Sequence, residues 1–170
     1  LAAEFLPPPE KPCWQTVLLG RTETPDVPAE RPEPALMPGA GHAICRGGGP
    51  REIAAVMTFA GHGGVHGHFD KLSFVLYGLG RELGVDPGRA SSYSLPVHRG
   101  WHRGTLAHNT VVVDGRCAEE AGGRAELFAA EGDYSAAAAA CGEANPGVAQ
   151  RRLLLAGPDG LLVLDDLRAA

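Results

Sequence analysis

The sequence is poor in cysteine, and its few cysteines lie far apart. They are Cys13, Cys45, Cys117 and Cys141 in a chain of 170 residues, and no two form a C-x-x-C pair. A disulfide scaffold requires a denser pattern, and a zinc site built from thiolates requires close pairs. The pattern therefore disfavours both classes, and we expect free or incidental cysteines.

Long apolar runs and basic clusters are also missing. No run approaches the roughly 20 consecutive apolar residues of a transmembrane helix, and the net charge of −5 argues against binding to nucleic acid. The chain opens with Leu1 and lacks the charged region that begins a signal peptide. We therefore expect an excerpt of a longer protein, with no membrane span and no nucleic-acid partner.

Residues 1–38 contain most of the 14 prolines. Proline at this density blocks both helix interiors and central strands, so residues 1–38 are predicted to be a linker or tail from a missing upstream domain. Within it, residues 14–19 could form a short helix or the end of a strand. We expect a β-domain over residues 39–170, truncated at its C-terminus.

Short apolar stretches separated by glycine-rich turns follow from residue 39 onward. This pattern is typical of an all-β, antiparallel β-sandwich. A long polar loop is predicted over residues 89–107, and loops of that length are usually functional when they contain aromatic residues. The predicted strands are residues 41–46, 52–59, 72–80, 110–113, 125–130 and 134–141, with a hairpin of 152–156 and 161–164 across the turn 157–160.

The segment His66-Gly67-His68-Phe69-Asp70 is the strongest candidate for chemistry. If it is a β-strand, residues i, i+2 and i+4 point to one face, and His66, His68 and Asp70 then line a single wall. Two imidazoles and a carboxylate are costly to bury together unless they bind a ligand or each other. The segment is therefore predicted to belong to a site.

Two further residues extend this candidate site. Asp86 lies in a proline-glycine turn, and His108 follows the long loop; with His68 they form a two-imidazole, one-carboxylate set. Such a set suits Zn²⁺ and leaves a fourth position for water. His66 is then free to act as a general base or to hold an anionic group. The alternative is three unrelated residues, with Asp86 in a turn and His108 in the core, or His66 itself as a ligand.

The polar and aromatic residues near this set have two interpretations each. Tyr93, Trp101 and Arg103 could stack on a sugar and pair with its carboxylate, or only pack within the loop. Asn109 could bind a substrate carboxylate or the backbone. Asp70 could orient an imidazole or form a salt bridge with an arginine. The remaining histidines are expected at the surface: His42, His62, His98 and His102.

Three motifs in this order resemble the β-sheet domain of the heparinase II/III-like polysaccharide lyases, which include the oligo-alginate lyases. They are residues 66–73 (HGHFDKLS), 86–88 (DPG) and 105–115 (TLAHNTVVVDG), and the resemblance covers about residues 40–165. It implies that an α/α-toroid precedes the sandwich and that the active site lies between the two domains. It also implies a location in the bacterial cell envelope or periplasm, or secretion.

Several site roles follow from this resemblance. It implies that His68, Asp86 and His108 bind a mainly structural zinc, and that His66 is the histidine that the sandwich contributes to catalysis. The family's catalytic tyrosine belongs to the toroid, which is absent from this chain. The expected function is therefore part of a lyase that cleaves alginate- or heparin-type glycans by β-elimination, inactive as a fragment. The alternatives are a zinc-stabilised carbohydrate-binding sandwich and, less favoured, a zinc hydrolase.

Overall fold

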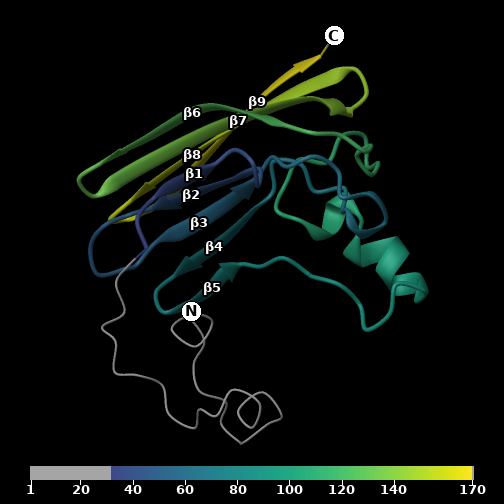
Figure 1. Cartoon of the computed structure of the whole chain (residues 1–170), viewed down its shortest axis with the longest axis horizontal. Helices are drawn as coiled ribbons and strands as arrows, with labels where there is room; N and C mark the ends of the chain where they lie inside the picture. The colour runs from purple at the N-terminus through teal and green to yellow at the C-terminus, as the bar shows by residue number, and fades with distance from the viewer. Residues whose placement is uncertain (1–31, 170) are drawn as a thin grey trace, which may run out of the picture. The chain divides into compact units, whose positions relative to one another are not determined.

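Two antiparallel sheets form the framework of the part of the chain that the computed structural model describes, residues 32–169 (Figure 1). Within each sheet, strands that follow one another in sequence are neighbours. The predicted all-β, antiparallel sandwich is confirmed. The first sheet contains β1 (Ala35–Met37), β2 (His42–Arg46), β3 (Ala54–Thr58), β4 (Phe74–Gly78) and β5 (Arg81–Gly84); the second contains β6 (Arg124–Glu131), β7 (Tyr134–Asn145), β8 (Val148–Gly157) and β9 (Gly160–Ala169).

A long connection between β5 and β6 leads from the first sheet to the second. It contains the turns η3 (His98–His102) and η4 (Thr105–Ala107), which project at the right-hand end of the sandwich in Figure 1. A third short turn, η2 (Gly64–His66), lies between β3 and β4. In the described residues, no helix is long and apolar enough to cross a membrane. The connection contains most of the predicted site residues, so the sheets act as its scaffold.

The first strand lies within the region predicted to be a linker. β1 pairs with β2 in the register Ala35↔Ile44, so the sheet begins before residue 39. Pro34 and Pro38 flank β1, and proline is tolerated there because β1 is an edge strand. Residues 1–31 of the predicted linker, including residues 14–19, lie outside the described residues.

Most predicted strands are present, but the one over residues 110–113 is wrong. Val111, Val112 and Val113 have high β propensity, yet they form an irregular segment outside both sheets. Their neighbours are held by side chains instead of a strand partner: Thr110 Oγ1 donates to Lys71 O at 2.7 Å, and Asn109 Nδ2 donates to Phe74 O at 2.9 Å. Hydrogen bonds to residues distant in sequence therefore prevail over local propensity here.

The core between the sheets is built mostly from small side chains. β7 contributes Ala137 and Ala139, both fully buried, which face the inner sides of the opposite strands. Met57, Leu72 and Leu154 are the largest apolar side chains that are fully buried. Alanine has little intrinsic preference for strands, but its small volume lets two sheets approach closely.

Ser135 on β7 joins the two sheets directly. Its hydroxyl accepts a hydrogen bond from Arg46 N at 2.6 Å and donates one to Arg46 O at 2.8 Å. Ser135 is buried, so both bonds are shielded from water. The end of β2 is therefore fixed against the second sheet.

Gly47, next to this junction, lies where the backbones of the two sheets approach each other closely. A Cβ at residue 47 would overlap the carbonyl group of Gly157, so the backbone of one of the two segments would have to shift. Gly47→Ala is therefore expected to lower the free energy of unfolding by about 1–3 kcal/mol, as overpacking does. Urea denaturation measures the change. The control is Gly39→Ala, where the added Cβ meets nothing within 4 Å; equal stability of the two variants would contradict the expectation.

The described cysteines are free, as predicted, but they differ in environment. Cys45 and Cys141 are buried, whereas Cys117 is exposed. Burial raises the pKa of the Cys45 thiol to about 11, and the hydrogen bond with Ser135 opposes this only in part. Since the thiolate is the reactive form, iodoacetamide at pH 8 should label Cys117 in the native protein and leave Cys45 unlabelled until unfolding. Peptide mass spectrometry reads this directly, and rapid native labelling of Cys45 would contradict it.

Candidate functional site

The segment that carries His66 and His68 is not a strand. η2 ends at His66, and residues 67–73 then follow an irregular path with a positive φ of 57° at Leu72. Its backbone bonds go to separate partners, with Phe69 N donating to Arg103 O and Leu72 N to Thr58 O. The prediction that His66, His68 and Asp70 share one face of a strand is therefore wrong.

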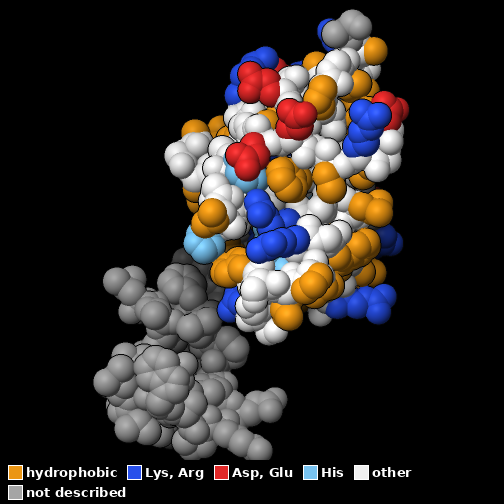
Figure 2. Space-filling view, turned by 90° about the vertical axis from the view of Figure 1, so that its right-hand side faces the viewer, with side chains coloured by type: hydrophobic (Ala, Val, Ile, Leu, Met, Phe, Trp, Pro, Cys, Tyr) orange, Lys and Arg blue, Asp and Glu red, His pale blue; other side chains and the backbone are white. Residues whose placement is uncertain are grey.

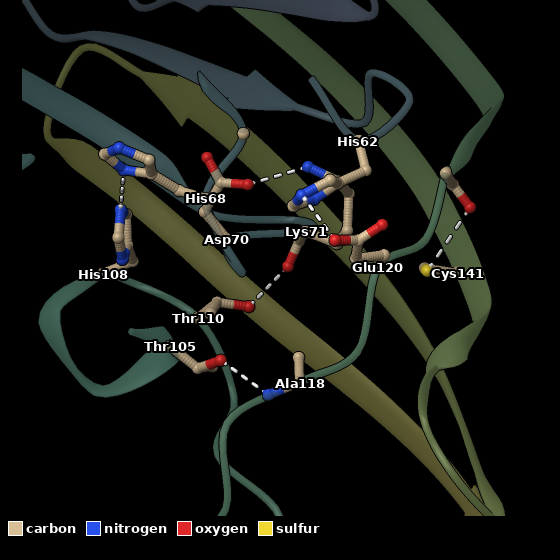
Figure 3. Close-up of polar contacts among 12 residues, drawn as sticks. His62, His68, Asp70, Lys71, Thr105, His108, Thr110, Ala118, Glu120 and Cys141 are labelled. Atoms are coloured by element: carbon tan, nitrogen blue, oxygen red, sulfur yellow. Dashed lines mark hydrogen bonds and ion pairs between the residues drawn. The ribbon is translucent and has the colours of Figure 1, made fainter. Parts of the chain in front are cut away.

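His68, Asp86 and His108 nevertheless meet at one point. One ligand atom from each lies within 4.8 Å of the others. His68 Nδ1 is 3.1 Å from His108 Nε2, as Figure 3 shows, and His108 Nε2 is 3.4 Å from Asp86 Oδ2. The side chain of His108 is fully buried, and that of Asp86 is partly exposed. Three residues distant in sequence thus form one compact group.

The hydrogen bonds around this group direct its donor atoms inward. His108 Nδ1 donates to Gly104 O at 2.9 Å, which leaves the lone pair of Nε2 facing His68. Asp86 Oδ1 accepts from Gly88 N at 2.7 Å, so Oδ2 is the oxygen that faces His108. His102 Nδ1 donates to Pro87 O at 3.1 Å and holds the same turn.

The donor set is chemically suited to a divalent metal such as zinc. Burial lowers the pKa of His68, and the neighbouring His108 adds to that effect, while Asp70 and Asp86 oppose it. The neutral imidazole that results is the form that binds metal. Two nitrogens bound tetrahedrally to one zinc lie about 3.3 Å apart, close to the 3.1 Å between His68 Nδ1 and His108 Nε2. The three residues could hold such an ion.

His66 lies at the exposed edge of this group, against an aromatic ring. The centroids of His66 and Tyr93 are 5.1 Å apart, edge to face, and Arg89 lies over the Tyr93 ring at 5.7 Å. Tyr93 and Trp101 remain 43% and 48% exposed. Both aromatic side chains are therefore accessible to a ligand, although their role as sugar contacts stays a prediction.

Arg103 and Asn109 donate hydrogen bonds from their side-chain nitrogens to backbone carbonyls around the site. Arg103 Nε donates to Gly67 O at 2.9 Å, between His66 and His68. Asn109 Nδ2 donates to Phe74 O and to Val85 O, at 2.9 and 3.0 Å. These bonds match the alternative in which Asn109 binds backbone, and substrate contact by either residue stays a prediction.

Three surrounding polar groups differ from the expectation. Asp70 pairs with Lys71, whose Nζ lies 2.7 Å from Asp70 Oδ1, and not with an arginine. His98 is 2% exposed, and neither of its ring nitrogens has a hydrogen-bond partner among the described residues, so its predicted surface position is wrong. His62 is also mostly buried, with its Nε2 3.4 Å from Glu120. His98 lies in a loop without apolar periodicity, so no sequence signal marked its burial.

The loop around His98 is positively charged. Burial lowers the pKa of His98, and Arg103, His102, Arg89 and Arg99 add to the effect. Figure 2 views the molecule from the side on which η3 and η4 project, and basic side chains gather near the middle of that face. The field near His66 therefore favours an anionic ligand.

Comparison with known proteins finds relatives in sequence that are alginate lyases. An alginate lyase of Stenotrophomonas maltophilia is 36% identical over 147 residues, covering 75% of this chain and 20% of the relative. An exo-oligoalginate lyase of Saccharophagus degradans is 36% identical over 77 residues, covering 40% of the chain and 10% of the relative. The chain thus spans about a fifth or less of the length of these proteins.

Solved structures share the fold. The heparinase III BT4657 gene product matches with a TM-score of 0.70 at 19% identity, over 92% of this chain and 25% of that one. The heparan sulfate lyase HepC of Pedobacter heparinus gives a TM-score of 0.70 at 19% identity, over 91% and 25%. The family described as heparinase II/III-like, C-terminal, matches residues 29–170. The chain belongs to the family of heparinase II/III-like C-terminal domains.

Proposed function

We propose that this chain is the sandwich part of a lyase that cleaves uronic-acid-containing polysaccharides by β-elimination. The observation that carries the proposal is the position of His66, exposed beside Tyr93 and two residues from His68 of the metal-binding group. The family match and the two alginate lyase relatives support this class of activity. An upstream helical toroid of the full-length protein supplies the remaining catalytic groups.

The proposed reaction explains the residue types. A base removes the C5 proton of the uronate, the C4–O bond breaks with its electrons leaving on oxygen, and a C4–C5 double bond forms. Donors at the uronate carboxylate stabilise the charge that develops there. His66 takes the C5 proton, because an imidazole accepts protons near neutral pH. Arg103 lies in the same region and pairs with the carboxylate, while Asn109 holds the backbone of the site through both of its side-chain N–H groups. Tyr93 and Trp101 stack on the sugar rings.

We further propose that His68, Asp86 and His108 bind zinc as a mainly structural ion. A bound zinc supplies positive charge and a fixed geometry at the junction of their three segments. The convergence of their ligand atoms and the lowered pKa of His68 support this assignment. His66 is two residues away, so its position depends on the same segment.

The experiment is an assay of the full-length protein against alginate first, then against heparin-type glycans. The expected result is growth of the ultraviolet absorbance of unsaturated uronates, with the product mass of a sugar lacking one water. Binding of oligosaccharide without unsaturated product from any uronate polymer would contradict the lyase and favour a carbohydrate-binding sandwich. Since such polymers occur outside the cytoplasm, we also propose a location in the cell envelope or beyond it, which cell fractionation tests.

A further inference from the structure

Arg152 on β8 is a charged side chain buried at the boundary between the second sheet and the site. It is 4% exposed. Its Nε and Nη2 donate to the two carboxylate oxygens of Asp165 on β9, at 2.9 and 2.7 Å. Its guanidinium lies 5.4 Å from the centre of the Phe74 ring. A buried ion pair of this kind can often be replaced by apolar residues without loss of stability. The other hydrogen bonds of Arg152 therefore say more about its role than the ion pair does.

The remaining nitrogen of Arg152 joins two distant segments of the site. Nη1 donates to Leu72 O and to Asn109 O, both at 2.6 Å. Leu72 lies four residues after His68, and Asn109 directly follows His108. One guanidinium nitrogen therefore bonds to both segments that carry the imidazoles, in addition to the direct bonds of Thr110 Oγ1 to Lys71 O and of Asn109 Nδ2 to Phe74 O.

Asn109 extends this connection to the third ligand segment. While its carbonyl accepts from Arg152, its side-chain amide donates to Val85 O at 3.0 Å. Val85 directly precedes Asp86. All three residues of the metal-binding group thus belong to segments held by Arg152 or by Asn109, which Arg152 itself binds.

We propose that Arg152, oriented by Asp165, is a positioning residue for the metal centre formed by His68, Asp86 and His108. It contacts neither the ion nor substrate, and it acts through the backbone carbonyls of Leu72 and Asn109. The inference rests on the proposed zinc site. The planar fork of arginine binds Asp165 and both carbonyls at once, which the single ammonium of lysine cannot do. Outer partners of this kind typically contribute 10–100-fold to metal affinity.

The test compares Arg152→Lys with Arg151→Lys in the full-length protein. Arg151 is the neighbouring residue on β8, but it is exposed and pairs with Glu126 at 2.6 Å. Zinc affinity is measured by competition with a chelator, and the geometry of the site by the visible spectrum of the Co²⁺ form. Arg152→Lys should bind zinc about 10–100-fold more weakly and change the Co²⁺ spectrum, while Arg151→Lys matches the wild type in both.

The outcomes separate this inference from the proposed function. Wild-type affinity and an unchanged Co²⁺ spectrum in folded Arg152→Lys would overturn the positioning role and leave the zinc site intact. Failure of the wild type to bind either metal would overturn both. If Arg152→Lys does not fold, Asp165→Asn carries the test, since it keeps the arginine and releases its orientation. It should change zinc affinity and the spectrum in the same direction, and a lower melting temperature with unchanged metal binding would overturn the role.

Discussion

His66→Ala in the full-length protein is expected to lower kcat/KM on a uronate polymer by about 10²–10⁴-fold, the usual contribution of a positioned acid or base. The reason is that the His66 imidazole is exposed to solvent beside Tyr93, whereas His68 belongs to the group of three residues that could bind a metal. Its removal should leave the fold and the zinc content unchanged, because the side chain is exposed. Product formation is followed by the absorbance of the unsaturated uronate.

The matched control is Val65→Ala, in the same short turn. Val65 is 77% exposed, so its truncation changes η2 without removing an ionisable group and should keep activity within a few-fold of wild type. Activity of His66→Ala near the wild-type value would contradict a catalytic role for His66. A decrease in both variants would instead assign the effect to the conformation of the turn.

Removing zinc is expected to destabilise the protein strongly. An ion that binds only the folded state, present at 100–1,000 times its dissociation constant, stabilises by about 2.7–4.1 kcal/mol, which corresponds to a melting-temperature change on the order of 10 °C for a domain of this size. Chelation of the wild type should therefore lower Tm by about that amount. Asp86→Asn should show a low Tm with or without zinc, because a neutral amide replaces the carboxylate beside His108 and the negative charge of this ligand is lost.

Asp159→Asn provides the control for this series, since Asp159 is an exposed carboxylate in the turn between β8 and β9. It should respond to chelation as the wild type does. The measurement is thermal unfolding with and without added zinc, alongside activity. Loss of activity on chelation with an unchanged Tm would contradict a structural zinc and favour an ion that takes part in chemistry.

The strands could be predicted where local pattern decides the structure. The sequence predicts the hairpin around Pro158 and Asp159 correctly, because two apolar runs flank a turn that contains proline and glycine. In the structure the two strands pair up to Gly157↔Gly160. The strand predictions around His66 and Val112 are wrong. Hydrogen bonds to residues far along the chain fix these segments, such as Phe69 N to Arg103 O and Thr110 Oγ1 to Lys71 O, and no local pattern contains that information.

The site could be predicted only in part. The spacing of His68, Asp86 and His108 does not establish convergence, and only the resemblance in three motifs suggested it. The sequence predicts Arg152 only as the first residue of a strand. Its hydrogen bonds go to the carbonyls of Leu72 and Asn109, which are far away in sequence. The burial of His98 was missed for the same reason, because loop packing leaves no periodic signal.

The contacts of Arg152 also have a consequence for the order in which the protein folds. Its partners Leu72 and Asn109 precede it by 80 and 43 residues, so these bonds cannot form on the ribosome until β8 has emerged. Contacts this distant in sequence carry a large loop-closure cost and usually form late. A nascent chain that ends before β8 would therefore lack the bonds of Arg152 to the segments of His68 and His108, and capture of the proposed ion would be completed late in maturation.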